Sequence, residues 1–82
     1  MKLSAEFVFE SGEAEKIYMA VLPELNDAFS DRSLVGLSLE ADGRLVLTVR
    51  AEDAVSMRSA LNTWFRLIQI AQEVSDLTAA AQ

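Results

Sequence analysis

The side chains most capable of chemistry lie close together, between residues 52 and 66 of the 82-residue chain. A carboxylate pair, Glu52 and Asp53, is followed by two hydroxyls, Ser56 and Ser59. The chain contains no histidine or cysteine, which removes the commonest general base, the thiolate nucleophile and the usual zinc ligands. Because nothing nearby resembles a base for the serines, we interpret them as helix-surface hydroxyls and Asp53 as a helix cap. We therefore expect no catalytic residue, no metal site and no cofactor.

A ladder of hydrogen-bond donors follows in the same stretch. Arg58, Asn62 and Arg66 are spaced four residues apart, which places them on one face of a helix. Asparagine is a poor helix former, and a hydrogen-bonding role would explain its place between two arginines. The alternative interpretation is an ordinary solvated face.

The helix that carries this ladder is predicted to run from about Ala54 to about Val74. Its apolar residues cover roughly half of the circumference, whereas a helix lying on a sheet needs a stripe only a little wider than ~100°. We expect Trp64 in the core, with Phe65 on one flank of the apolar arc and Leu67 with Val74 on the other. Packing against an earlier helix would cover one flank, so some apolar surface should remain for a partner.

The first half of the chain predicts a strand and a helix. Residues 3–9 alternate between the two faces of a strand, with the period of two that marks a half-buried strand. Ser11 is a good N-cap for a helix that we extend to Phe29, with a kink at Pro23. Alternatively, the helix stops near Leu22 and a turn follows.

Two further strands form a predicted hairpin. Residues 35–41 and 45–51 both alternate, and between them lies Asp42-Gly43, the strongest short-range hairpin signal. A type I′ turn is expected here, with positive φ at both residues.

The predicted order is strand, helix, strand, strand, helix, which gives an α+β fold in one domain over residues 1–82. The return strand of the hairpin lies between the other two strands, so the three-stranded sheet is antiparallel and both helices cover one face. The other face is mostly polar, and two strand edges stay exposed. A domain this small, without disulfides or a metal, often gains stability by oligomerisation. We therefore expect the sheet to continue across a dimer.

The charge of the chain limits its partners. The formal net charge of −6 argues against unaided binding to nucleic acid or to an anionic membrane. Residues 44–72 nevertheless carry a local excess of two positive charges, which could touch a phosphate without driving the binding. The longest apolar run, residues 18–22, is far shorter than the roughly 20 residues of a membrane span, and no signal-peptide pattern follows Lys2. We expect a cytoplasmic protein with no membrane partner.

Residues 51–68 resemble one protein family closely. The Pcc family (polarised growth chromatin-associated controller) has a last helix with the pattern acidic cap, Ser, apolar, Arg, small, small, Leu, Asn, Ser/Thr, aromatic, apolar, Arg. The matching residues are Asp53, Ser56, Met57, Arg58, Ser59, Ala60, Leu61, Asn62, Thr63, Trp64, Phe65 and Arg66. Earlier segments agree more loosely, so only this helix is a specific signal.

The resemblance implies a function that composition does not show. Pcc proteins are small dimerising subunits of KEOPS, the complex that makes the threonylcarbamoyl modification of an adenosine in tRNA. Catalysis belongs to a separate sugar-kinase-like subunit, which the small subunit binds through its helices, as a homodimer or as a heterodimer with a paralogue. We expect a scaffold whose direct contact with tRNA, if it has one, is weak. The expected partner-binding residues are Met19, Arg58, Asn62, Phe65, Arg66 and Ile70, the apolar three making contact and the polar three hydrogen-bonding at the rim or within the fold.

An alternative from a different class is a stand-alone RNA-binding module of the KH-like or split-βαβ type. It requires tight, salt-sensitive binding of RNA by the isolated chain. Stacking of bases needs aromatic residues on the bare sheet face, and that face is predicted to have none.

Overall fold

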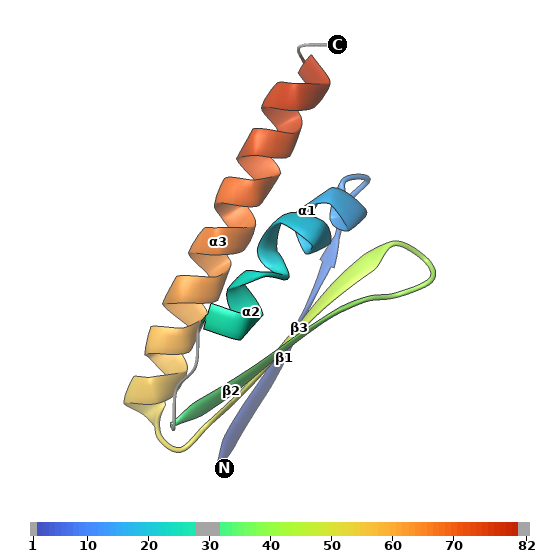
Figure 1. Cartoon of the computed structure of the whole chain (residues 1–82). Helices are drawn as coiled ribbons and strands as arrows, with labels where there is room; N and C mark the ends of the chain where they lie inside the picture. Colours follow the sequence, from blue (N-terminus) through green and yellow to red (C-terminus); the bar gives the residue numbers. More distant parts are fainter. Residues whose placement is uncertain (1, 28–31, 81–82) are drawn as a thin grey trace.

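The computed structural model describes residues 2–27 and 32–80, which form a two-layer α+β fold with helices on one face of an antiparallel sheet (Figure 1). This confirms the predicted order of elements and the fold class. In chain order the elements are β1 (Leu3–Glu10), α1 (Ala14–Val21), α2 (Glu24–Asp27), β2 (Ser33–Leu39), β3 (Arg44–Ala51) and α3 (Ala54–Ala80).

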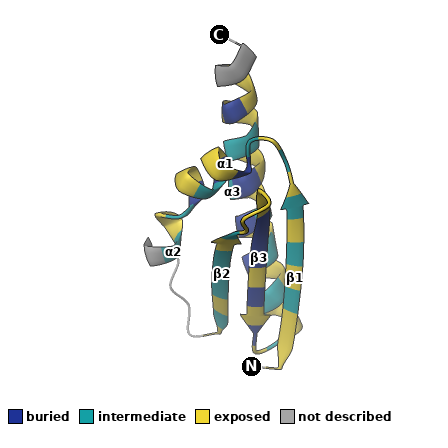
Figure 2. Ribbon diagram, turned by 90° about the vertical axis from the view of Figure 1, so that its right-hand side faces the viewer, coloured by how far each residue is buried: buried dark blue, intermediate teal, exposed yellow. Residues whose placement is uncertain are grey.

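The sheet has the order β1-β3-β2, with both neighbours antiparallel to β3, as predicted. Leu47 lies at its centre, opposite Phe7 of β1 on one side and Leu37 of β2 on the other. The residues of β3 that face the helices are fully buried, which makes this strand the middle of the core (Figure 2). They are Leu45, Leu47, Val49 and Ala51.

The hairpin between β2 and β3 forms where it was predicted, but its turn type was predicted wrongly. Only a glycine has positive φ among the described residues, namely Gly43 with φ 86°, so Asp42 does not adopt the type I′ conformation. The Gly43 N–H donates to the carbonyl of Glu40 at 3.0 Å, and the Glu40 N–H donates to the carbonyl of Arg44 at 2.8 Å. This is a three-residue loop with glycine at the left-handed position, which needs positive φ only once. Asp42 instead accepts a hydrogen bond from the Arg44 N–H (3.2 Å) and pairs with its guanidinium (2.7 Å).

The helix predicted to continue past Pro23 with a kink is interrupted there instead. Helix α1 ends at Val21, and the Leu22 N–H makes the last bond of its ladder, to the Tyr18 carbonyl at 2.9 Å. A turn follows before the four-residue α2, because proline has no N–H to donate and its ring crowds the preceding turn. Phe29, the predicted end of this helix, lies outside the described residues.

The start of α1 also differs from the prediction. The helix begins at Ala14 and not directly after Ser11, whose hydroxyl accepts a hydrogen bond from the Glu13 N–H at 3.0 Å. Ser11 therefore shapes the turn before the helix, and no side chain caps the first turn of α1 itself.

Helix α3 is capped as predicted but is longer than predicted. The Asp53 carboxylate accepts the Ser56 N–H at 2.8 Å, which satisfies one of the unpaired amides at the helix start. The helix runs for 27 residues to Ala80, beyond the expected end at Val74, and a helix of this length spans about 40 Å. It accounts for the long dimension of the molecule, which measures 44 × 22 × 19 Å. Trp64 is only 2% exposed, which confirms its predicted place in the core.

Candidate protein-interaction surface

A groove of about 370 Å³ lies where the first half of α3 passes the start of β1. Its apolar lining comes from both elements, and two polar side chains of α3 that are exposed to solvent border it. The apolar residues that matter are Leu3, Met57, Leu61 and Phe65, and the polar ones are Arg58 and Asn62. Such a groove can receive an apolar side chain while the guanidinium and amide bind a carbonyl or carboxylate.

Three phenylalanines fix α3 against β1 beside this groove. The ring of Phe65 meets the ring of Phe7 edge-on, with centroids 4.8 Å apart and planes at 87°. Phe9 lies 6.2 Å from Phe65 in a similar edge-on arrangement. Edge-to-face geometry is favourable for aromatic pairs, yet all three residues remain only half-buried. The aromatic cluster is therefore incompletely covered at the outer edge of the sheet.

The structure brings together three of the six residues expected to bind a partner. Arg58, Asn62 and Phe65 line the groove beside β1. Arg66 lies further along α3 and is exposed to solvent. Among the described residues, neither Arg58 nor Arg66 makes an ion pair.

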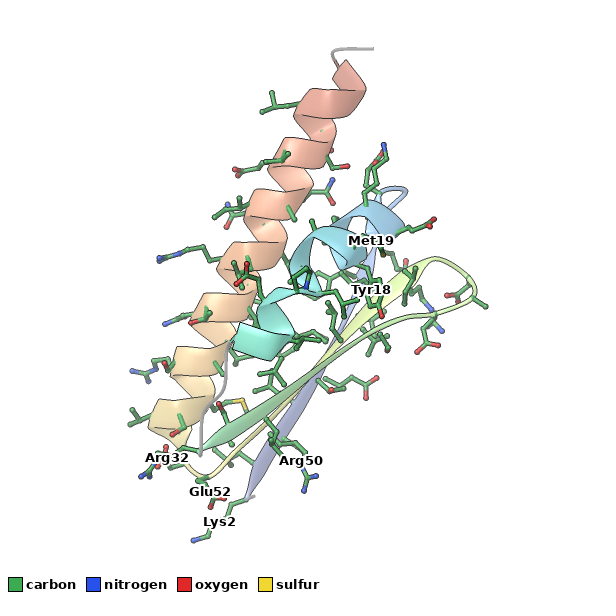
Figure 3. The ribbon with its side chains drawn as sticks, in the orientation of Figure 1. Lys2, Tyr18, Met19, Arg32, Arg50 and Glu52 are labelled. Atoms are coloured by element: carbon green, nitrogen blue, oxygen red, sulfur yellow. The ribbon has the colours of Figure 1, made fainter. Side chains whose placement is uncertain are left out.

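The remaining two expected residues lie elsewhere. Met19 is on α1 (Figure 3), 62% exposed, and Ile70 is on the second half of α3, 50% exposed. Neither lines the groove.

The second half of α3 carries an apolar stripe that was only partly expected. It consists of Ile70, Val74 and Leu77, whose positions i, i+4 and i+7 lie on one helix face. Their side chains are 50%, 56% and 71% exposed. Leu77 escaped the sequence analysis because the helix was predicted to end at Val74. The continuing period was the signal that could have revealed it.

A polar clamp holds this half of α3 against the turn that precedes α1. The Ser75 hydroxyl, in a residue only 6% exposed, donates to the Glu13 carboxylate at 2.7 Å. The Ser11 hydroxyl donates to the side-chain carbonyl of Gln72 at 3.1 Å. The pKa of Glu13 is lowered from its ordinary value, first by the Ser75 hydroxyl and then by the Lys16 ammonium 3.2 Å away.

A second groove, of about 630 Å³, lies on the other flank of α3 beside β2 and is rich in hydroxyls. Asp53 pairs with Arg32 here, and its pKa is lowered to about 2, first by the Ser56 N–H and next by Arg32. The Ser56 side chain also hydrogen-bonds the Asp53 carboxylate, whose lowered pKa makes it a weak base for activating the hydroxyl of Ser56 or Ser59.

The described residues contain neither a metal site nor a membrane span. No three histidine, cysteine, aspartate or glutamate residues among them gather closely enough to hold a metal ion. None of the helices in this part of the chain combines the length and the apolar character needed to cross a membrane.

Comparison with protein families identifies the family of this chain. The family model described as "Transcription factor Pcc1" matches residues 2–76, which is nearly the whole chain. A search of the curated proteins found no match.

Proposed function

Because this chain belongs to the Pcc1 family, we propose that it is a non-catalytic scaffold subunit of KEOPS, the complex that makes threonylcarbamoyl-adenosine in tRNA. The match over residues 2–76 is the observation that carries the proposal. In this role the chain acts as one Pcc-type domain in the cytoplasm. It pairs with a second copy or a paralogue and binds the sugar-kinase-like catalytic subunit through its helices.

The chemistry of the chain supports a role without catalysis. Histidine and cysteine are absent from the sequence, and the carboxylate beside the hydroxyls of the second groove, Asp53, has a pKa lowered to about 2 and is therefore a weak base. The carboxylates of Asp53, Glu13 and Asp42 cap a helix, join two elements and pair within the hairpin turn, respectively. Their contacts explain them as structural groups.

The exposed apolar residues of α1 and α3 suit a protein partner. Met19 on α1 and Ile70 and Leu77 on α3 are 62%, 50% and 71% exposed. Burial of such side chains in an interface contributes roughly 1.5–3 kcal/mol each in transfer free energy. We assign Met19, Ile70 and Leu77 to contact with the catalytic subunit, with Arg66 hydrogen-bonding at the rim.

A stand-alone RNA-binding module is the competing function, and two observations weigh against it. The chain has a net charge of −6, and Arg32 and Arg44 are each paired with an aspartate. On the open face of the sheet, β1 and β3 alternate so that Phe7 and Phe9 turn toward the helices and no aromatic side chain of the three strands faces outward. A direct contribution to tRNA binding is therefore expected to be weak.

The test is the mass of the purified chain in solution, alone and mixed with a KEOPS catalytic subunit. We expect a dimer that takes up the catalytic subunit, and we expect Ile70→Glu and Leu77→Glu to weaken that binding at least tenfold. Val55→Glu is the matched control, because Val55 is 78% exposed on the same helix but lies at its opposite end. A chain that ignores the catalytic subunit and instead binds RNA tightly would overturn the proposal.

A further inference from the structure

The charged side chains of α3 are separated by sign along the length of the helix. The first half, residues 54–66, carries Arg58 and Arg66 and no acidic residue. The second half, residues 67–80, carries Glu73 and Asp76 and no basic residue. The negative end of the helix dipole lies at this end too, and the last turn holds no basic side chain to offset it. The second half of α3 is therefore an acidic surface.

The two acidic side chains of this surface have only neutral hydrogen-bond partners. Glu73 and Asp76 each accept a hydrogen bond from the side-chain amide of a glutamine one turn earlier, at 3.3 Å and 2.8 Å. Among the described residues neither carboxylate makes an ion pair. Asp53, which caps α3, differs because it lies against the guanidinium of Arg32. The negative charges of Glu73 and Asp76 are thus not neutralised within the described part of the chain.

Glu73 directly borders the exposed apolar residues of the same half of the helix. It follows Ile70 by three positions and precedes Leu77 by four, so these side chains are neighbours on the helix surface. Glu73 is exposed, and Ile70 and Leu77 are 50% and 71% exposed. The last turns of α3 rise beyond the sheet, so a large partner can reach them (Figure 1). Apolar contact and negative charge therefore belong to one surface.

We propose that this acidic–apolar surface, formed by Ile70, Glu73, Asp76 and Leu77, selects a partner surface whose apolar centre is bordered by lysine or arginine. The inference rests on the proposed function and deepens it, because it states the chemistry that the catalytic subunit must present to α3. A cation of the partner placed against Glu73 or Asp76 makes a charge-assisted hydrogen bond. Burial of the apolar side chains excludes water beside that pair and strengthens it, whereas an acidic partner surface is repelled.

The change of sign along α3 also limits where the partner lies. A basic partner surface is attracted to the second half of the helix and repelled from the first half, where Arg58 lies. Arg66 stands at the boundary, beside Ile70, and can donate a hydrogen bond to a neutral acceptor at the rim. The catalytic subunit is therefore expected to cover the second half of α3 and to leave the first half exposed.

The test is the rate at which the intact chain associates with a KEOPS catalytic subunit, measured by stopped flow at several salt concentrations. For the wild type we expect the association rate constant to fall roughly tenfold between about 20 mM and about 500 mM NaCl, with little change in the dissociation rate. In Glu73→Lys/Asp76→Lys, association at low salt should be roughly tenfold slower than in the wild type. Lysine is favourable near the C-terminal end of a helix, so this variant should fold, which circular dichroism checks.

The matched control is Glu40→Lys/Glu52→Lys, which changes the net charge by the same amount. Both positions are exposed and lie beside the sheet, at the end of β2 and the end of β3. Because only the overall field of the chain changes in this variant, association should slow by less than about threefold. The comparison therefore separates the local charge of α3 from the net charge of the chain.

The outcomes distinguish this inference from the proposed function. An association rate independent of salt, or an equal loss in the two variants, would overturn the inference, while continued binding of the catalytic subunit would keep the scaffold role. Faster association of Glu73→Lys/Asp76→Lys would show that the partner surface is acidic and would overturn it as well. A wild-type chain that does not bind the catalytic subunit would overturn the proposed function itself, and this inference with it.

Discussion

The hydroxyl of Ser75 donates a hydrogen bond of 2.7 Å to the carboxylate of Glu13, 62 residues earlier in the sequence. Ser75 is a buried polar residue of α3, and its partner lies in the turn between β1 and α1. The bond therefore ties the second half of the long helix to the beginning of the chain. Because Ile70, Val74 and Leu77 lie on the same half of the helix, the bond also fixes how this apolar stripe is oriented relative to α1.

Removal of this bond should loosen the end of α3 more than the rest of the fold. In Ser75→Ala, we expect the backbone amides of the last turns of α3 to exchange with solvent roughly tenfold faster, the size of effect that the loss of one charge-assisted hydrogen bond produces. The measurement is hydrogen–deuterium exchange of the intact chain. The control is Ser59→Ala on the exposed face of the same helix, and equal effects of the two variants would show that the clamp contributes nothing.

The cap of α3 predicts an acid-sensitive stability. The pKa of Asp53 is lowered from 3.8 to about 2 by the Ser56 N–H and by Arg32, so the charged form is favoured in the folded state. Its contribution is therefore fully present above about pH 4 and is lost as the pH falls toward 2. We expect the melting temperature of the wild type to fall across this range.

Asp53→Asn is the matched variant for this pH dependence. Asparagine also caps helices well, but it does not titrate. The difference in melting temperature between wild type and variant should therefore shrink as the pH is lowered from 5 to about 2. A constant difference over this range would contradict the assigned role of the carboxylate.

Trp64 is predicted to be the largest single contributor to the core. It is 2% exposed on the buried face of α3, so Trp64→Ala should lower the free energy of unfolding by roughly 3–5 kcal/mol. Urea denaturation followed by circular dichroism measures this loss. Val55→Ala on the exposed side of the same helix should change it by less than about 0.5 kcal/mol. A stable Trp64→Ala variant that only fails to bind a partner would contradict the core assignment.

The hairpin glycine offers a test in which only backbone conformation changes. A Cβ at Gly43 would meet no atom within 4 Å, but its φ of 86° is unfavourable for any other residue. Gly43→Ala should therefore cost about 1 kcal/mol of unfolding free energy. Gly12→Ala is the control, since Gly12 has equally open surroundings without a positive φ, and it should be neutral or slightly stabilising.

The sequence predicted correctly those elements in which the pattern of apolar and polar residues matches the pattern of buried and exposed side chains. Alternation identified all three strands, because each strand has one face against the helices and one exposed. The Asp53 cap and the core position of Trp64 followed from the same kind of pattern. The order of the strands was predictable because only the return strand of the hairpin can lie antiparallel to both of the others.

The misplaced features depend on contacts that a local pattern does not contain. The dipeptide Asp42-Gly43 is compatible with two loop types, and the register of Leu39 with Leu45 selects the longer one. The length of α3 beyond Val74 depends on the bonds that Gln72 and Ser75 make with the distant turn before α1. Which of the expected partner-binding residues line the groove depends on how α3 lies against the sheet, which brings Phe65 beside Phe7 and is not fixed by neighbouring residues in the sequence.

The place of β3 in the middle of the sheet has a consequence for the order of events during synthesis. β1 and β2 are not hydrogen-bonded to each other, because β3 lies between them in the sheet. Both leave the ribosome before β3 does. The first strand therefore has no neighbour until residues 44–51 have emerged, and helix α3 comes later still. We expect the nascent chain to stay without a sheet over its first half and to fold late, with the edge of β1 unprotected meanwhile. The glutamates at positions 6 and 10 then act as gatekeepers against premature association of this strand.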